Sequence, residues 1–161
     1  MKGIAAAALL LFAGLAQVTW APRLMLLGVF PNLVLVLVVA ITWTHGQRVG
    51  LACACAGGLV LDLAAPGPLG PHALALLAGA YLTGFWARNV PHASIAQPAL
   101  ATAVATVLYS GVLVGVDDLL GLAEPPPALA AQLTGAAALY NAVLSIPVVL
   151  ALRRTREEAA A

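Results

Sequence analysis

Charged side chains are so few in this sequence that the stretches between them are long enough to cross a lipid bilayer. Seven lysines and arginines and six aspartates and glutamates are spread over 161 residues, so that 8% of the chain is charged and 63% is hydrophobic. A soluble domain has about a quarter of its residues charged, because its surface must face water. The sequence therefore predicts an integral membrane protein. Its net charge of +1 gives no basis for binding nucleic acid.

The positions of the charges and of the turns rich in proline and glycine predict six helical spans. A helix needs about 20 residues to cross a hydrocarbon core of about 30 Å. We expect an all-α protein with a single transmembrane domain over residues 1–161, in which the first span is retained and is not a cleaved signal peptide. Within the second span, Phe30-Pro31-Asn32 predicts a kink or a break. The expected spans cover about residues 3–22, 24–44, 49–65, 71–87, 94–116 and 128–152.

The basic residues predict how the spans are oriented. An even number of spans places both termini on one side, and Arg23 is then the one basic residue on the other side. The basic residues that share the side of the termini are Lys2, Arg48, Arg88, Arg153, Arg154 and Arg156. The positive-inside rule therefore predicts a multi-pass protein with both termini in the cytoplasm. The terminal arginine cluster is most simply a topogenic anchor beside anionic lipid, and the alternative is contact with a cytoplasmic protein.

The third span carries the most informative pattern. Gly50, Ala54, Gly58 and Asp62 recur at every fourth residue and so share one stripe of a helix, with Gly57 beside it. Small residues at this spacing let another backbone approach closely, which is how helices associate where lipid supplies no hydrophobic driving force. We expect this stripe to pack against other helices of the same chain.

Asp62 has three interpretations, all of which require it to face protein, because exposing a carboxylate to lipid is costly. The functional interpretation is a proton, ion or substrate site. The structural one is that Asp62 pairs with Arg23, or accepts backbone N–H groups from the turn at 66–70, which ends in Gly70, and from the following helix. A catalytic base has the least support, because no second carboxylate lies at comparable depth in the membrane.

The remaining polar and sulfur-containing side chains predict no reactive centre. Asn141 lies near the middle of the sixth span, where its amide needs a partner on a neighbouring helix, with contact to a ligand as the alternative. Cys53 and Cys55 are expected to be buried thiols. The three histidines, at 45, 72 and 92, have no companion at metal-ligand spacing. We therefore predict no catalytic, cofactor or metal site.

Four blocks of sequence occur in a recognisable order. The first three are Pro31-Asn32-Leu33-Val34-Leu35-Val36, then Gly50 followed by Gly57-Gly58-Leu59-Val60-Leu61-Asp62-Leu63, then Pro68-Leu69-Gly70. Leu139-Tyr140-Asn141-Ala142-Val143-Leu144 follows before the basic tail. In order, spacing and chain length, these blocks resemble the rod shape-determining protein MreD family.

The resemblance implies a non-enzymatic membrane scaffold in the machinery that elongates the lateral wall of bacterial cells, located in the inner membrane. Members of the family accompany MreC, a bitopic membrane protein, and work with the actin-like MreB and with RodA and its penicillin-binding protein in peptidoglycan synthesis. The family fold resembles the six-helix membrane subunit that binds substrate in energy-coupling-factor vitamin transporters. No cofactor is implied.

Two other functions compete with the scaffold. A substrate-binding subunit of a vitamin transporter would need an outer pocket with several convergent polar groups. A membrane hydrolase of the lipoprotein signal peptidase type would need a second acidic residue beside Asp62. The block that ends in Asp62 superficially resembles the first aspartate region of that peptidase family, but leucines replace the asparagine and arginine that flank the aspartate there.

Overall fold

The computed structural model is a helical bundle in the residues that it describes, which are 3–19, 23, 25, 28–90, 94, 96–122 and 126–158. The helices are α1 (Gly3–Thr19), α2 (Leu33–His45), α3 (Gln47–Ala64), α4 (Pro71–Asn89), α5 (Ala96–Leu119) and α6 (Pro127–Glu158). The prediction of an all-α fold with six helices is confirmed. Lys2 and His92, which entered the predictions of orientation and metal binding, lie outside the described residues.

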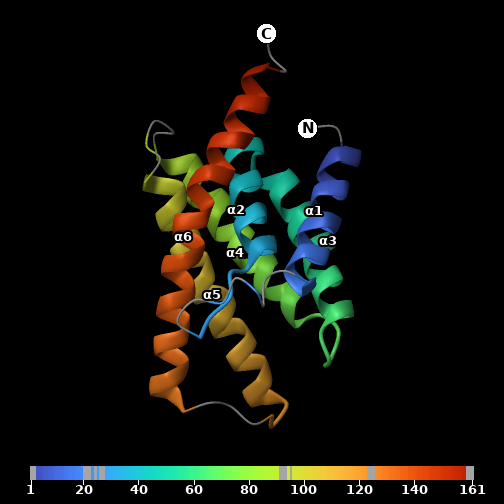
Figure 1. Cartoon of the computed structure of the whole chain (residues 1–161), viewed down its shortest axis with the longest axis vertical. Coiled ribbons are helices and arrows are strands. Elements are labelled where there is room, and N and C mark those ends of the chain that lie inside the picture. The colour runs from blue at the N-terminus through green and yellow to red at the C-terminus, as the bar shows by residue number, and fades with distance from the viewer. Residues whose placement is uncertain are drawn as a thin grey trace.

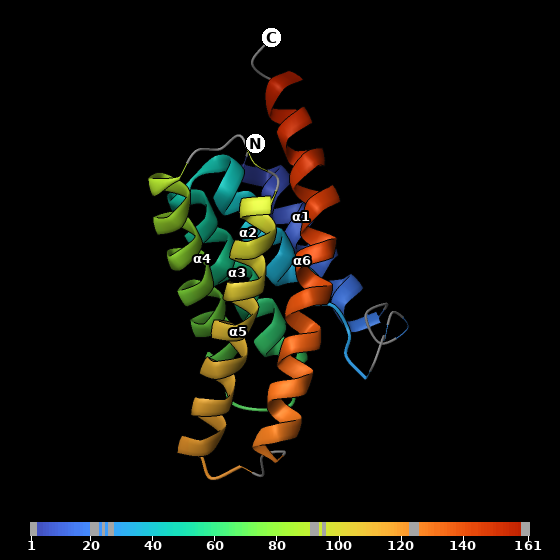
Figure 2. The same cartoon turned by 90° about the vertical axis from the view of Figure 1, so that its left-hand side faces the viewer.

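The helices run up and down, so that the beginning of α1 and the end of α6 lie at the same end of the bundle (Figures 1 and 2). α1, α3 and α5 lead away from this end, and α2, α4 and α6 return to it. We call it the basic end, because Arg48, Arg88, Arg153 and Arg154 lie at the helix termini there. At the opposite end, α5 and α6 continue past the turn between α3 and α4 (Figure 2).

The second helix begins later than the sequence indicates. The expected span starts at about residue 24, but α2 starts at Leu33 and has 13 residues. Pro31 has no backbone N–H, and Asn32 caps the helix by accepting the backbone N–H of Leu35 at 3.0 Å. The proline block is therefore the beginning of a helix and not a kink within a longer one.

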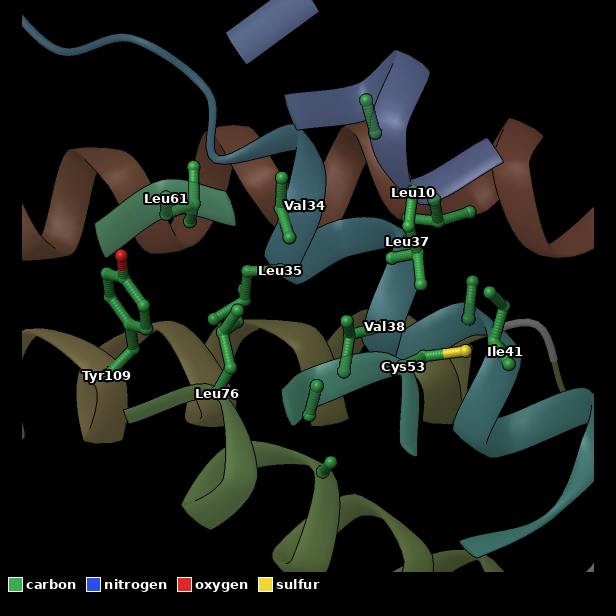
Figure 3. Close-up of a cluster of buried hydrophobic side chains, with 14 of the residues drawn as sticks. Leu10, Val34, Leu35, Leu37, Val38, Ile41, Cys53, Leu61, Leu76 and Tyr109 are labelled. Atoms are coloured by element: carbon green, nitrogen blue, oxygen red, sulfur yellow. The ribbon is translucent and has the colours of Figure 1, made fainter. Parts of the chain in front are cut away.

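α2 lies at the centre of the bundle. Its buried residues run without interruption from Val34 to Thr44, which explains why its sequence is apolar on every side. Figure 3 shows Leu35, Val38 and Ile41 of this helix among side chains from α1, α3, α4 and α5. The core therefore forms around the shortest helix, and the longer helices surround it.

Three of the described helices are long and apolar enough to cross a membrane by length and composition, namely Gln47–Ala64, Ala96–Leu119 and Pro127–Thr155. α2 is apolar but is shorter, and α1 has 17 residues. The protein is thus a helical membrane protein, and the count of six spans stays a prediction. The expected boundaries of the other spans differ from the helix ends by a few residues, except that α6 continues to Glu158.

The two cysteines have different surroundings. Cys53 lies in the buried apolar cluster (Figure 3), whereas Cys55 is exposed. The prediction of two buried thiols is therefore wrong for Cys55. Residues two positions apart on a helix point in directions about 200° apart, so only one of them faces the core.

Candidate functional site

The small residues of the third span lie where α3 meets its neighbours. All four of the expected positions are buried, namely Gly50, Ala54, Gly57 and Gly58. A Cβ atom at Gly58 would overlap the backbone of Ala73 in α4, and one at Gly50 would overlap Thr42 in α2. Glycine at these two positions therefore sets how closely α2 and α4 approach α3.

Asp62 connects the end of α3 to the beginning of α4. Its side chain is 3% exposed. One carboxylate oxygen, Oδ1, accepts the backbone N–H of His72 at 2.9 Å, and Oδ2 accepts that of Ala73 at 3.2 Å. The first N–H groups of a helix have no partner within the helix, and the helix dipole favours negative charge there. Asp62 thus caps the next helix, which is one of the alternatives that the sequence left open.

Gly70 makes the turn that brings α4 back to Asp62. Its φ of +118° lies in the left-handed region, and no heavy atom lies within 4 Å of where a Cβ atom would be. A side chain here is disfavoured by backbone conformation and not by crowding. Pro71 follows at the first position of α4, where a missing N–H costs nothing.

Asn141 of α6 joins three helices through its amide. It is 1% exposed. Its Oδ1 accepts the backbone N–H of Asn32 at 2.9 Å, and its Nδ2 donates to Thr106 Oγ1 of α5 at 3.1 Å. The expectation of a partner on a neighbouring helix thus has two contacts behind it, one to α5 and one to the cap of α2. Asn32 in turn caps α2, so the two asparagines form one polar network.

Gln17 of α1 adds a second connection to the same place. Its Nε2 donates to the carbonyl of Pro31 at 2.9 Å, and its Oε1 accepts the backbone N–H of Leu33 at 2.6 Å. These backbone groups belong to the first turn of α2 and the residues before it, which lack partners within the helix. One side chain therefore anchors α1 to the beginning of α2.

His72 and Tyr109 form a further pair between α4 and α5. The Tyr109 hydroxyl and His72 Nδ1 are 2.7 Å apart, and the two rings stack with centroids 5.9 Å apart and planes 15° apart. Asp62 accepts the backbone N–H of His72, and Tyr109 bonds to its ring. Both the main chain and the side chain of His72 are therefore held in place. The His72 side chain therefore has a fixed position between α4 and α5.

These polar groups surround a cavity of about 430 Å³ in the half of the bundle away from the basic end. Its volume falls in the range of about 300–1,000 Å³ that is usual for ligand sites. Every helix or the connection before it contributes to the wall, which comprises Gln17, Phe30, Asn32, Leu61, Ala64, Ala65, His72, Thr106, Tyr109, Ser110, Leu113, Ala137 and Asn141. The surface of this wall is mainly apolar, and the polar side chains in it are amides, hydroxyls and one imidazole. Such a wall suits a guest that is mainly apolar and has a few neutral hydrogen-bonding groups.

The sequence did not identify most of this cavity. Asp62, Gly70 and Asn141 were expected to matter, but Gln17, Thr106 and Tyr109 were not selected. Their common signal is a polar side chain in the interior of an apolar span, and Thr106 and Tyr109 are three residues apart on one face. In the described part of the chain, no three His, Cys, Asp or Glu side chains gather as they would around a metal ion.

Long apolar helices, a buried carboxylate that caps the next helix and a mainly apolar pocket between the helices define a helical membrane protein. The family model for the rod shape-determining protein MreD matches residues 2–154. The chain belongs to the MreD family, as the sequence blocks indicated, and so has a role in determining rod shape. No curated protein and no solved structure matches it.

Proposed function

We propose that this chain is a non-enzymatic scaffold of the cell-wall elongation complex, with six spans and both termini in the cytoplasm. In this role it binds an MreC-like bitopic protein and works with MreB, RodA and the penicillin-binding protein of RodA in lateral peptidoglycan synthesis. The supporting observations are its membership of the family and the cavity of about 430 Å³. The bacterial inner membrane is the location that this role requires.

The cavity is the proposed docking site for the partner. With the basic end in the cytoplasm, the cavity lies in the outer half of the bundle. A bitopic protein that crosses the bilayer beside the bundle would bring the segment next to its span to this level. That segment would have both apolar and polar groups, which is the chemistry that the wall accommodates, with Tyr109 and His72 beside Leu61 and Leu113.

The residues selected from the sequence have a supporting role in this proposal. Gly50, Ala54, Gly57 and Gly58 allow the helices around the cavity to pack closely. Asp62 fixes the start of α4, and Asn141 fixes the start of α2 against α5 and α6. None of them needs to contact the partner for the cavity to keep its shape.

A matched pair of substitutions on α5 tests the docking site. Ser110 lines the cavity, so Ser110→Trp should fill it, whereas Val107 is 53% exposed on the helix surface and Val107→Trp should not. We expect Ser110→Trp to weaken co-purification with the MreC-like partner by about tenfold or more, and Val107→Trp to leave it nearly unchanged. Equal capture by the two variants, with both monodisperse in detergent, would exclude the cavity as the docking site.

The cavity volume also favours a second candidate function, binding of a small molecule as in a vitamin transporter subunit. The same variants separate the two functions. The transporter function would be favoured over the scaffold if the purified protein bound a vitamin at submicromolar concentration and Ser110→Trp abolished this binding. In that case Ser110→Trp should still capture the MreC-like partner.

A further inference from the structure

A second, apolar groove of about 420 Å³ runs between α1 and α6, on the side of the bundle that Figure 1 faces. α1 packs on α2 and α3, and α6 packs on α2 and α5, so α2 forms the floor between two walls. Phe12 and Ala13 lie in one wall, Val148 and Ala151 in the other, and Val36 in the floor. Thr155 is the one polar residue among those that line the groove.

The groove extends over half of a bilayer. Along α6 it runs from Leu144 to Thr155, which is about 16 Å of helix at about 1.5 Å per residue. The hydrocarbon core is about 30 Å thick, so about 16 Å corresponds to one leaflet. At the deep end, Gln17 is bonded to the residues that begin α2 and ties α1 to the floor. A transmembrane helix of a partner is about 10 Å wide and needs the full thickness. A single acyl chain matches the length of the groove better.

The end of the groove that Thr155 lines lies at the basic end of the molecule. Thr155 lies there, directly after Arg153 and Arg154 and before Arg156. The Arg154 side chain is exposed. Arginine binds phosphate groups through paired N–H donors, and each basic residue near an anionic membrane surface contributes about 1 kcal/mol of attraction. The apolar groove and the arginines at its end are therefore arranged like the acyl chain and the phosphate headgroup of a lipid.

We propose that the groove between α1 and α6 binds one anionic phospholipid of the leaflet at the basic end. One acyl chain lies over α2 between Phe12 and Val148, and the phosphate lies beside Arg154. This site is separate from the cavity beside Asn141, because the two share no lining residue, and the proposal does not depend on which partner that cavity binds.

Native mass spectrometry of the full chain in mild detergent tests the proposal, with added dioleoyl phosphatidylglycerol or dioleoyl phosphatidylcholine. We expect one bound lipid, with phosphatidylglycerol preferred about fivefold, which corresponds to about 1 kcal/mol. Arg154→Gln should remove most of this preference and keep the bound lipid. Equal binding of both lipids by the unaltered chain would overturn the assignment of the headgroup.

Substitutions that fill the groove test its location. Ala151→Phe adds an aromatic ring to one wall, and Leu150→Trp adds one at the neighbouring position, which does not line the groove. We expect Ala151→Phe to reduce lipid occupancy at least fivefold and Leu150→Trp to leave it unchanged. Ala16→Phe, at the deep end, provides a second filling variant if the first aggregates. Two results would overturn the proposal. One is unchanged lipid binding in both filling variants. The other is that the filling variants no longer bind a single-span protein partner but still bind the lipid.

Discussion

Glycines on α3 and on α5 have the same chemistry but opposite surroundings. On α3, a Cβ atom at Gly50 or Gly58 would overlap atoms of a neighbouring helix. On α5, Gly111 and Gly115 are also four residues apart, yet no heavy atom lies within 4 Å of an added Cβ atom at either position. Spacing by four residues alone therefore does not show where a small residue serves helix packing. The glycines of α3 serve packing within the chain, whereas those of α5 lie on an exposed face.

The largest expected difference between the two helices comes from adding bulk. Gly58→Leu must displace the backbone of Ala73, which cannot move away as a flexible side chain could, so the loss should exceed about 3 kcal/mol. Gly111→Leu should fold normally, because its site is open. The yield of monodisperse protein and its thermal midpoint in detergent measure both. Similar midpoints for the two variants would show that α3 and α4 are not closely packed.

The next largest difference in stability is expected between the aspartates near the C-terminal ends of α3 and α5, namely Asp62 and Asp118. Asp62→Ala leaves the backbone N–H groups of His72 and Ala73 without an acceptor and should cost about 1–3 kcal/mol. Asp62→Asn keeps one acceptor oxygen, so its stability should lie between those of the unaltered chain and Asp62→Ala. Asp118→Ala, at the exposed end of α5, should change stability by less than about 0.5 kcal/mol. Thermal unfolding of all three gives the order, and an Asp118 effect as large as that of Asp62 would contradict it.

A smaller loss is expected where α5 is held to α6. Asn141→Ala removes the bonds to Thr106 and to the backbone of Asn32, and polar contacts between membrane helices contribute about 0.6 kcal/mol each on average. We expect a loss of about 1–2 kcal/mol by the same measurement. Leu139→Ala, at a neighbouring position that is 69% exposed, is the matched control and should have little effect. A control as destabilised as Asn141→Ala would indicate that the amide network is dispensable.

The smallest effect has the opposite sign. Gly115→Ala introduces a better helix former at an open site and should raise stability by a few tenths of a kcal/mol. Gly58→Ala should lower it, because the same methyl group meets Ala73. If Gly115→Ala were also destabilising, its face would have to be in contact with something, such as a second copy of the chain.

The features that the sequence could predict are local in the chain. Sparse charge predicts apolar helices, and spacing by four places Gly58 and Asp62 on one stripe. The start of α2 was predicted only in part, because Phe30-Pro31-Asn32 indicates a kink or a break without showing that residues 28–30 before it are not helical. The cavity was missed for another reason. Asn141 and Asn32 are bonded although 109 positions separate them, and no single-sequence pattern reports such a distance.

The cap that Asp62 places on α4 also bears on how the protein is made. While α3 is alone in the bilayer, its carboxylate has no backbone donors from α4, and an unpartnered charge within a membrane helix opposes insertion. The donors arrive as soon as the turn through Gly70 has formed and the first residues of α4 follow. During synthesis, α3 and α4 should therefore enter the membrane together as a single hairpin, and a ribosome stalled between them would leave α3 poorly inserted.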